Sequence, residues 1–219
     1  MGRLGHVSSS QPLKRKLFPM GFAGEVMQVI LETWQNFSLH CSVRHETRIT
    51  AVFRDALIKA YVAAGRSWFV TLEDPITDPT LGTEEGRNDI NFYPPQHYGQ
   101  TIFFTVECKR LHVTRASGFA SLIDAYVEEG MQRFVSGQYS GGMPCGGMVG
   151  YVMDNQIKIA FDKLQYEIRR CLKRLCVPDH KSILKPSSVL PSYEFSADTM
   201  HERLDGKFAL YHLLLGVHK

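Results

Sequence analysis

The sequence has no long hydrophobic run. Hydrophobic residues make up 44% of the 219 residues and charged residues 21%, yet no segment reaches the ~20 consecutive apolar residues that a membrane-spanning helix needs. The first segment, MGRLGHVSSSQPLKRKLF, contains neither the apolar core nor the small-residue cleavage site of a secretory signal. We therefore expect a non-secreted, cytoplasmic, globular protein without membrane contact.

Several sequence patterns that are typical of disulfide frameworks, metal sites and catalytic nucleophiles are also missing. The five cysteines are scattered and never form C-x-x-C, which argues against a disulfide framework and a zinc site. The nine histidines show no H-x-x-x-H spacing, and none is paired in sequence with a serine or cysteine as a nucleophile would require. The glycine pairs near residues 141–147 lack the spacing of a nucleotide-binding loop, and we interpret them as turns. His201 and His212 are expected to face each other across a final hairpin as a structural pair.

Positive charge is in slight excess, with a formal net charge of +3. Basic residues cluster at 14–16, 109–115 and 169–174. Each cluster could contact the phosphates of a polyanion. A solvated helix face or a terminus is the commoner explanation for any one of them.

Apolar residues at helical spacing predict several helices. The expected helical ranges are 22–38, 45–65 with a stop at Gly65, 120–136, and a long helix that Asp154 or Asn155 would cap and Pro178 would end.

Strand-like runs alternate with these helices. The expected strands are 67–72, then 88–93 and 101–111 joined by a turn around 94–99, then 147–152, and a last hairpin with a type I′ turn at Asp205-Gly206. A loop would span Pro75 to Gly86, with Glu73 and Asp74 at the strand's exit or, alternatively, at the cleft. The pattern predicts one α/β domain, a mixed central sheet flanked by helices, with a core at about 22–176 and a C-terminal hairpin extension at about 190–219.

Charged residues interrupt two of the apolar strands. Side chains alternate along a strand, so Glu107 and Lys109 share one face and project together at the strand's end. If the two central strands pair as a hairpin, Asp89 can lie beside Glu107. Two adjacent carboxylates repel unless a cation lies between them. Magnesium suits such a site because it binds one or two carboxylates together with phosphate oxygens and water.

The set Asp89, Glu107 and Lys109 thus has the chemistry of phosphodiester hydrolysis. The lysine would stabilise the attacking water and the charge that accumulates on the phosphate. The alternative is a surface ion pair between Glu107 and Lys109 with Asp89 as an unrelated turn residue. An isolated E-x-K favours that alternative. The apolar strand before it, the helix after it and the acidic residue in the upstream helix favour a site.

With these parts in this order, the chain resembles the PD-(D/E)XK, or restriction-endonuclease-like, nuclease superfamily. The similar segments are HETRIT with Glu46, SWFVTL, GRNDINF with Asp89, VECKR, the helix YVEEGMQRFVSGQYS and the strand GGMVGYV, over residues 45–152. The resemblance implies a restriction-endonuclease-like core. The segment 178–219 lies outside it.

The resemblance also implies roles for single residues. Asp89 and Glu107 would bind Mg²⁺, which Mn²⁺ could replace, with the Cys108 backbone carbonyl as a further ligand and Glu46 near a bound water or second ion. Glu46 as a plain N-terminal helix carboxylate is an equal alternative. Lys109 would orient the water, Gln132 would hold the lysine and water, and Arg133 would hold a phosphate. The chain departs from the Gln-x-x-x-Tyr form of some subfamilies, because Ser136 stands four residues after Gln132 and the nearest tyrosine is Tyr139.

The expected function is that of a Mg²⁺-dependent endonuclease acting on nucleic acid, with DNA preferred and RNA left open. Cutting both strands would need two sites, hence a homodimer or partner subunits, and a bacterial defence system is a context given by analogy only. The alternative is a nucleic-acid-binding or scaffolding subunit that keeps the fold without cleaving. A sheet-and-helix module with a chance E-x-K is the third hypothesis.

Overall fold

The structure is a computed structural model that describes residues 11–37, 43–77, 83–95, 101–179 and 183–217. Its helical elements are α1 (Gln11–Leu17), α2 (Phe22–Gln35), α3 (Glu46–Ala63), α4 (Ile123–Ala125), the π-helix η2 (Tyr126–Met131), α5 (Gln132–Val135) and α6 (Ile157–Arg170). Its strands are β1 (Phe69–Thr77), β2 (Glu84–Tyr93), β3 (Phe104–Leu111), β4 (Val113–Arg115), β5 (Gly118–Ala120), β6 (Cys145–Val152), β7 (Lys185–Pro186), β8 (Ser196–Arg203) and β9 (Gly206–Gly216). None of the helices in this part of the chain is long and apolar enough to cross a bilayer.

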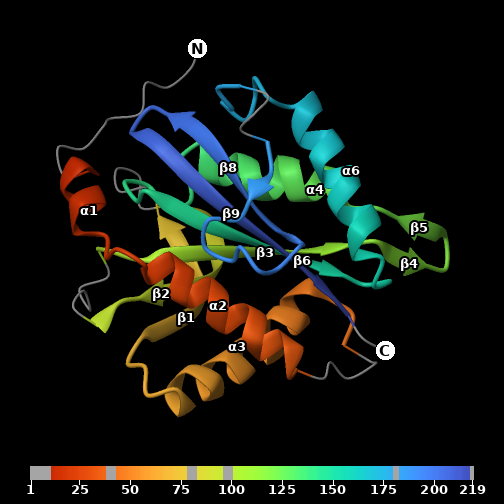
Figure 1. Ribbon diagram of the computed structural model, residues 1–219, viewed down its shortest axis with the longest axis horizontal. Helices are drawn as coiled ribbons and strands as arrows, with labels where there is room; N and C mark the ends of the chain where they lie inside the picture. Colours follow the sequence, from red (N-terminus) through yellow and green to blue (C-terminus); the bar gives the residue numbers. More distant parts are fainter. Residues whose placement is uncertain (1–10, 38–42, 78–82, 96–100, 180–182, 218–219) are drawn as a thin grey trace.

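A seven-stranded mixed sheet forms the centre of the molecule, in the order β1-β2-β3-β6-β9-β8-β7. Strands β3, β6 and β9 are parallel neighbours, and the other pairs are antiparallel. Helices α2 and α3 cover one face of the sheet, and α4 and α6 lie on the other (Figure 1). The prediction of a mixed α/β sheet flanked by helices is therefore confirmed. The C-terminal hairpin β8–β9 is part of this sheet, because β9 pairs directly with β6.

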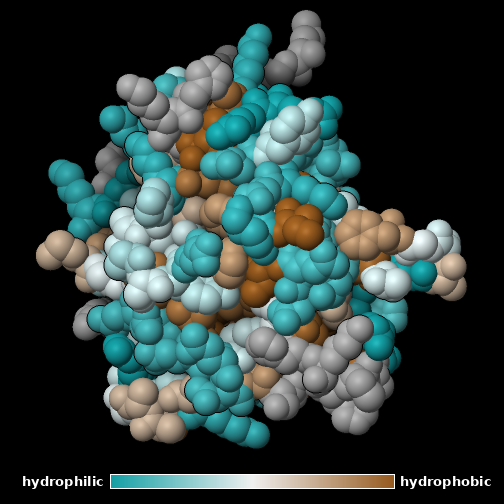
Figure 2. Space-filling view, turned by 45° about the vertical axis from the view of Figure 1, so that its right-hand side comes forward, coloured by the Kyte–Doolittle hydropathy of each residue, from teal (hydrophilic) through white to brown (hydrophobic). Residues whose placement is uncertain are grey.

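Two apolar cores lie on the two faces of the sheet. Strand β3 contributes Phe104, Val106 and Cys108 to the core under α2 and α3. The second core lies on the side of η2, α5 and α6. Thr105, Glu107 and Lys109 take the second face of β3, as the alternation predicts, and all three are buried. On the outer surface in Figure 2, hydrophobic residues form separate brown areas between hydrophilic side chains.

Several predicted boundaries were wrong. Strand β1 runs on through Glu73, Asp74 and Pro75, and Gly86 lies inside β2, so the predicted loop is largely a strand pair. Pro75 is tolerated because β1 is the edge strand of the sheet.

Other differences concern helices and turns. The predicted helix over 120–136 contains the π-helical segment η2. The last helix, α6, has Gln156 as its N-cap residue and ends at Arg170, well before Pro178. A type I′ turn needs positive φ at both central residues, but at the β8–β9 turn only Gly206 has it, at 114°, and Leu204 and Asp205 do not. The segment 113–120, for which no structure was predicted, forms the small β4–β5 hairpin.

His201 and His212 are buried but do not oppose each other across the hairpin, as had been predicted. His201 pairs with Phe208 and His212 with Ala197. The two rings are joined instead through Thr199, whose Oγ1 lies 2.7 Å from His201 Nε2 and 2.8 Å from His212 Nε2.

The chain of hydrogen bonds closes at both ends. Tyr126 Oη is 3.0 Å from His212 Nδ1, and His201 Nδ1 is 2.7 Å from the Leu175 carbonyl oxygen. A single direction satisfies every group: Tyr126 donates to His212, His212 to Thr199, Thr199 to His201, and His201 to the carbonyl. Both rings are neutral in this arrangement.

This network predicts acid sensitivity of the fold. Burial lowers the pKa of His201 to about 4 and of His212 to about 3, from an ordinary 6.5. Below pH ~6.5 the unfolded chain binds protons that the folded chain does not, so stability falls as the pH falls toward 4. We expect wild type to lose about 3 kcal/mol more over this interval than His201→Gln, measured by urea unfolding. The exposed His45→Gln is the control and should follow wild type; equal slopes for all three proteins would contradict the prediction.

Candidate active site

Asp89 lies where the β2–β3 ladder ends. The two strands pair only through Ile90–Phe92 and Phe104–Val106. Beyond these pairs the Cys108 N–H points toward β2, and Asp89 Oδ2 accepts its hydrogen bond at 2.7 Å. The carboxylate therefore replaces a backbone carbonyl at the first position where the ladder is open.

Glu107 is the most deeply buried carboxylate of this region, with its side chain 1% exposed. Its Oε1 is 2.9 Å from Lys109 Nζ and 3.4 Å from Arg133 Nη1. The other oxygen, Oε2, is buried and has no hydrogen-bond partner among the described residues. One oxygen of Glu107 is thus compensated by two cations, while the second remains available.

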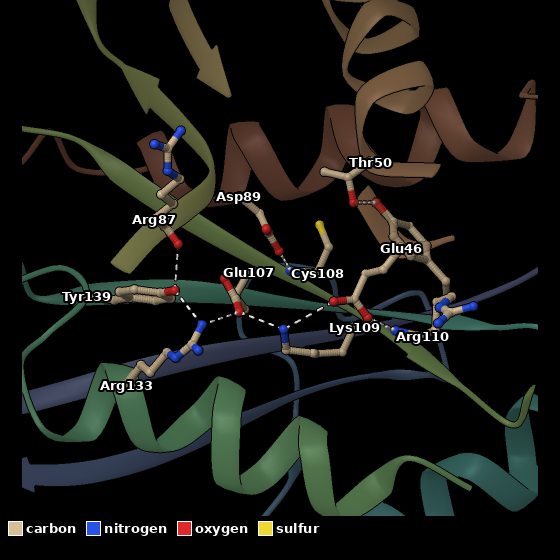
Figure 3. A network of polar contacts seen from close by, with 11 residues as sticks. Glu46, Thr50, Arg87, Asp89, Glu107, Cys108, Lys109, Arg110, Arg133 and Tyr139 are labelled. Carbon is tan, nitrogen blue, oxygen red and sulfur yellow. Dashed lines mark hydrogen bonds and ion pairs between the residues drawn. The ribbon is translucent and has the colours of Figure 1, made fainter. Parts of the chain in front are cut away.

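Glu46, the first residue of α3, holds Lys109 from the other side. Its Oε1 is 3.2 Å from Lys109 Nζ, and its Oε2 accepts the backbone N–H of Arg110 at 2.7 Å. Lys109 Nζ therefore lies between the two glutamates (Figure 3). Glu46 thus contacts Lys109 and the Arg110 backbone while it lies at the N-terminus of α3, and its role near a bound water or a second ion stays a prediction.

Arg133 and Tyr139 close the network on its opposite end. Arg133 Nη1 donates to Tyr139 Oη at 2.7 Å, and Tyr139 donates to the Arg87 carbonyl at 2.6 Å. The polar contacts consequently run without a break from Arg87 through Glu107 and Lys109 (Figure 3).

Small residues allow the helical segment to approach the sheet. A Cβ atom on Gly130 would lie 2.5 Å from Met148 Cε, and one on Gly146 would lie 2.5 Å from Phe134 Cε1. The end of the Met148 side chain is flexible and can shift, whereas the Phe134 ring is rigid. Gly146 therefore lets α5, which carries Arg133, lie close to β6.

The electrostatics show crowded negative charge. Burial raises the pKa of Glu107 to about 8, with the charge of Asp89 adding to the effect and Lys109 and Arg133 opposing it. Burial also raises the pKa of Asp89, and the hydrogen bond from the Cys108 N–H and the charge of Lys109 oppose the rise. Burial works to lower the pKa of Lys109, but the charges of Glu107, Glu46 and Asp89 outweigh it and raise the pKa. The lysine is thus held as a cation, and the acid pair has room for additional positive charge.

Of the predicted site residues, the structure brings together Asp89, Glu107, Lys109 and Glu46. Gln132 is different. It begins α5, its Oε1 is buried without a hydrogen-bond partner, and no hydrogen bond or ion pair within the described ranges joins it to this cluster. Cys108 gives its N–H to Asp89, and a role for its carbonyl stays a prediction.

Tyr139 is the residue that sequence reasoning missed, since it was noted only as standing at the wrong spacing. The chain turns at Gly137, which has a φ of 81°, and the Tyr139 N–H then bonds to the Arg133 carbonyl at 3.0 Å. Gly137 after the helix was the available signal for this turn.

No protein-family model, no curated protein and no solved structure matches the chain. Within the described ranges, no group of three or more His, Cys, Asp or Glu side chains has the arrangement of a metal site. The chemistry of the cluster therefore has to be argued from its own geometry.

The neighbouring carboxylates predict that substitutions of Lys109 and of Glu107 have different effects on the free energy of unfolding. Lys109→Met leaves Glu107 and Glu46 without their shared cation and should lower the free energy of unfolding by about 3 kcal/mol. Glu107→Gln removes the repulsion with Asp89 and the cost of burying a charge, so its stability should equal or exceed that of wild type. Urea unfolding above the pKa of Glu107, at a pH of about 9 where its carboxylate is ionised, measures both.

The matched control for the lysine is Lys158→Met. Lys158 pairs with Asp162 on the exposed surface of α6, and such a pair contributes about 0.3–0.5 kcal/mol. If Glu107→Gln were as destabilising as Lys109→Met, Glu107 would be a structural ion-pair residue and the site would not be strained.

Proposed function

We propose that this protein is a metal-dependent nuclease with a restriction-endonuclease-like core. The observation that carries the proposal is the convergence of Asp89, Glu107 and Lys109, from two strands, at the point inside β3 where its pairing with β2 ends and not, as predicted, at the end of the strand. The order α3, β1, β2, β3, α4–α5, β6 supports it, since each acidic or basic residue stands on the element that the resemblance assigns to it. DNA is the proposed substrate, cut as a homodimer or with partner subunits.

The donor set fits a hard divalent cation. It consists of carboxylate oxygens, which Mg²⁺ and Mn²⁺ prefer. Glu107 Oε2 is buried and has no hydrogen-bond partner in the described part of the chain, and the charge of Asp89 acts on the same carboxyl group. Asp89 and Glu107 would hold the ion, with the Cys108 carbonyl and Glu46 as further candidates. When bound, the ion would supply Lewis-acid polarisation of the phosphate and a more acidic water.

The protein's own residues supply the rest of the chemistry. Lys109 is kept protonated by its acidic neighbours, so it acts as a fixed cation that stabilises developing negative charge rather than as a base. Glu46 fixes the amine on one side and Glu107 fixes it on the other. Arg133 is 38% exposed and shares Glu107, so its guanidinium can hold a phosphate oxygen.

The proposal is tested by cleavage of plasmid DNA, labelled single-stranded DNA and RNA with Mg²⁺. We expect wild type to cut and Asp89→Ala, Glu107→Gln and Lys109→Ala to lose about 10²-fold or more in rate, because Asp89 and Glu107 would hold the cation and Lys109 supplies positive charge that stabilises the transition state. Lys158→Ala should cut as wild type, and circular dichroism should show all variants folded.

No cleavage by wild type with either Mg²⁺ or Mn²⁺ would favour the non-cleaving, nucleic-acid-binding alternative. Equal loss in Lys158→Ala would point to an effect unrelated to the site.

Metal binding is measurable without catalysis. An ion that binds only the folded protein raises its stability by about 2.7 kcal/mol at a concentration of about 100 Kd. We expect Mg²⁺ or Mn²⁺ to raise the unfolding temperature of wild type and to leave that of Glu107→Gln unchanged. A rise of equal size in both proteins would place the ion elsewhere.

A further inference from the structure

A pocket of about 340 Å³ lies beside the candidate active site. The lining residues that matter here are Asp74, Asn88, Asn91, Tyr93, Phe103 and Ser140. Phe103 lies just before β3, on the same face as Thr105 and Glu107. Ser140 follows Tyr139, which is the hydrogen-bond partner of Arg133. The pocket and the catalytic cluster therefore share a strand face and a turn.

A chain of hydrogen bonds fixes the wall of the pocket. Thr105 Oγ1 donates to Asn91 Oδ1 at 2.7 Å, and Asn91 Nδ2 donates to Asp74 Oδ2 at 2.8 Å. Tyr93 Oη donates to the same Asp74 oxygen at 2.9 Å. The carboxylate of Asp74 is thereby held in one orientation by several donors.

The backbone is deformed to place this carboxylate. Regular alternation along β1 would put Asp74 on the face opposite to Thr71. Glu73 adopts a left-handed conformation with a φ of 52°, which is unfavourable for a residue with a side chain. As a result Asp74 reaches Asn91 and Tyr93 on the face of the active site. Strain of this kind is typical of functional positions.

The chemistry of the lining selects a class of ligand. None of the described lining residues is Lys, Arg or His, so the pocket does not suit a phosphate. It offers a carboxylate acceptor, the side-chain amides of Asn88, Asn91 and Gln138, and the half-buried ring of Phe103. Asn88 Oδ1 and Ser140 Oγ are buried without hydrogen-bond partners in the described chain. A flat, neutral heterocycle that carries N–H donors matches this set.

We propose that the pocket receives one unpaired nucleobase of the nucleic acid whose phosphate lies at Glu107 and Lys109. This inference rests on the proposed function, and it specifies the substrate as single-stranded or as carrying a base rotated out of a duplex. The base stacks on Phe103, and its exocyclic amino group donates to Asp74. Adenine, cytosine and guanine are therefore bound more tightly than thymine, which lacks that group.

The test measures binding in the Glu107→Gln background, so that cleavage does not interfere. The probes are three labelled duplexes of one sequence: fully paired, with a single bulged cytosine, and with a bulged abasic site. Fluorescence anisotropy should show the bulged cytosine bound about tenfold tighter than the abasic bulge, because only the former offers a base to stack. A bulged thymine should lie between the two.

Variants assign the difference to the pocket. Phe103→Leu keeps apolar contact with Tyr93 but offers no ring, and it should abolish the preference for the bulged cytosine. Phe119→Ala is the matched control, because Phe119 is an exposed aromatic residue on the β4–β5 hairpin, and it should keep the preference. Thermal unfolding confirms that both variants fold.

The outcomes separate the two proposals. Equal binding of all duplexes, or a preference unchanged by Phe103→Leu, overturns the base pocket even if wild type cleaves DNA. A Phe103-dependent preference for the bulged base in a protein that never cleaves would retain the pocket and overturn the nuclease. Failure to bind any of the duplexes overturns the pocket as well.

Discussion

The buried carboxylate of Glu107 is the constraint on which the arrangement of this site depends. A charge at such depth is unfavourable unless it is compensated, and Lys109 and Arg133 compensate only one of its oxygens. Asp89 adds a second carboxylate instead of a further cation. A region selected for stability alone would not combine two acids in this way. The imbalance is what a cation or a phosphate-bound metal would relieve, and it is the physical basis of the proposed nuclease.

The fold supplies the positions from which this charge is held. Because β3 and β6 are parallel, the chain must cross between them, and η2 and α5 form that crossover over the face that carries Glu107. Gly146 allows the ring of Phe134, on α5, to lie close to the sheet. Arg133 then reaches Glu107 from α5, while Glu46 reaches Lys109 from α3. The compensating groups therefore come from elements that are distant in sequence.

Sequence periodicity was sufficient for much of this arrangement. The alternation along β3 placed Glu107 and Lys109 on one face, and the hairpin placed Asp89 beside them. The contact of Glu46 with Lys109 was not predictable, because it depends on where α3 begins over the sheet. Tyr139 was not assigned to the site, and Asp74 was considered for the cleft only as an alternative to the exit of a strand. Each reaches the site because a residue before it has a positive φ, Gly137 for Tyr139 and Glu73 for Asp74. The hydrophobic pattern of the sequence does not predict a positive φ at a non-glycine residue such as Glu73.

The two polar regions on this face of the sheet differ in charge, and this difference suggests that they bind different parts of a ligand. Around Glu107 the carboxylates are accompanied by Lys109 and Arg133, and such a mixture binds phosphate and metal. Around Asp74 the same kind of acid is surrounded only by neutral donors, a lining that excludes phosphate and accepts N–H groups. Thr105 lies on the same face of β3 as Glu107, and it begins the hydrogen-bond chain that runs through Asn91 to Asp74. A polymer whose anionic backbone alternates with flat, neutral heterocycles would be complementary to both regions at once, and this complementarity is the reason for proposing that a nucleobase enters the pocket when the phosphate lies at the charged cluster.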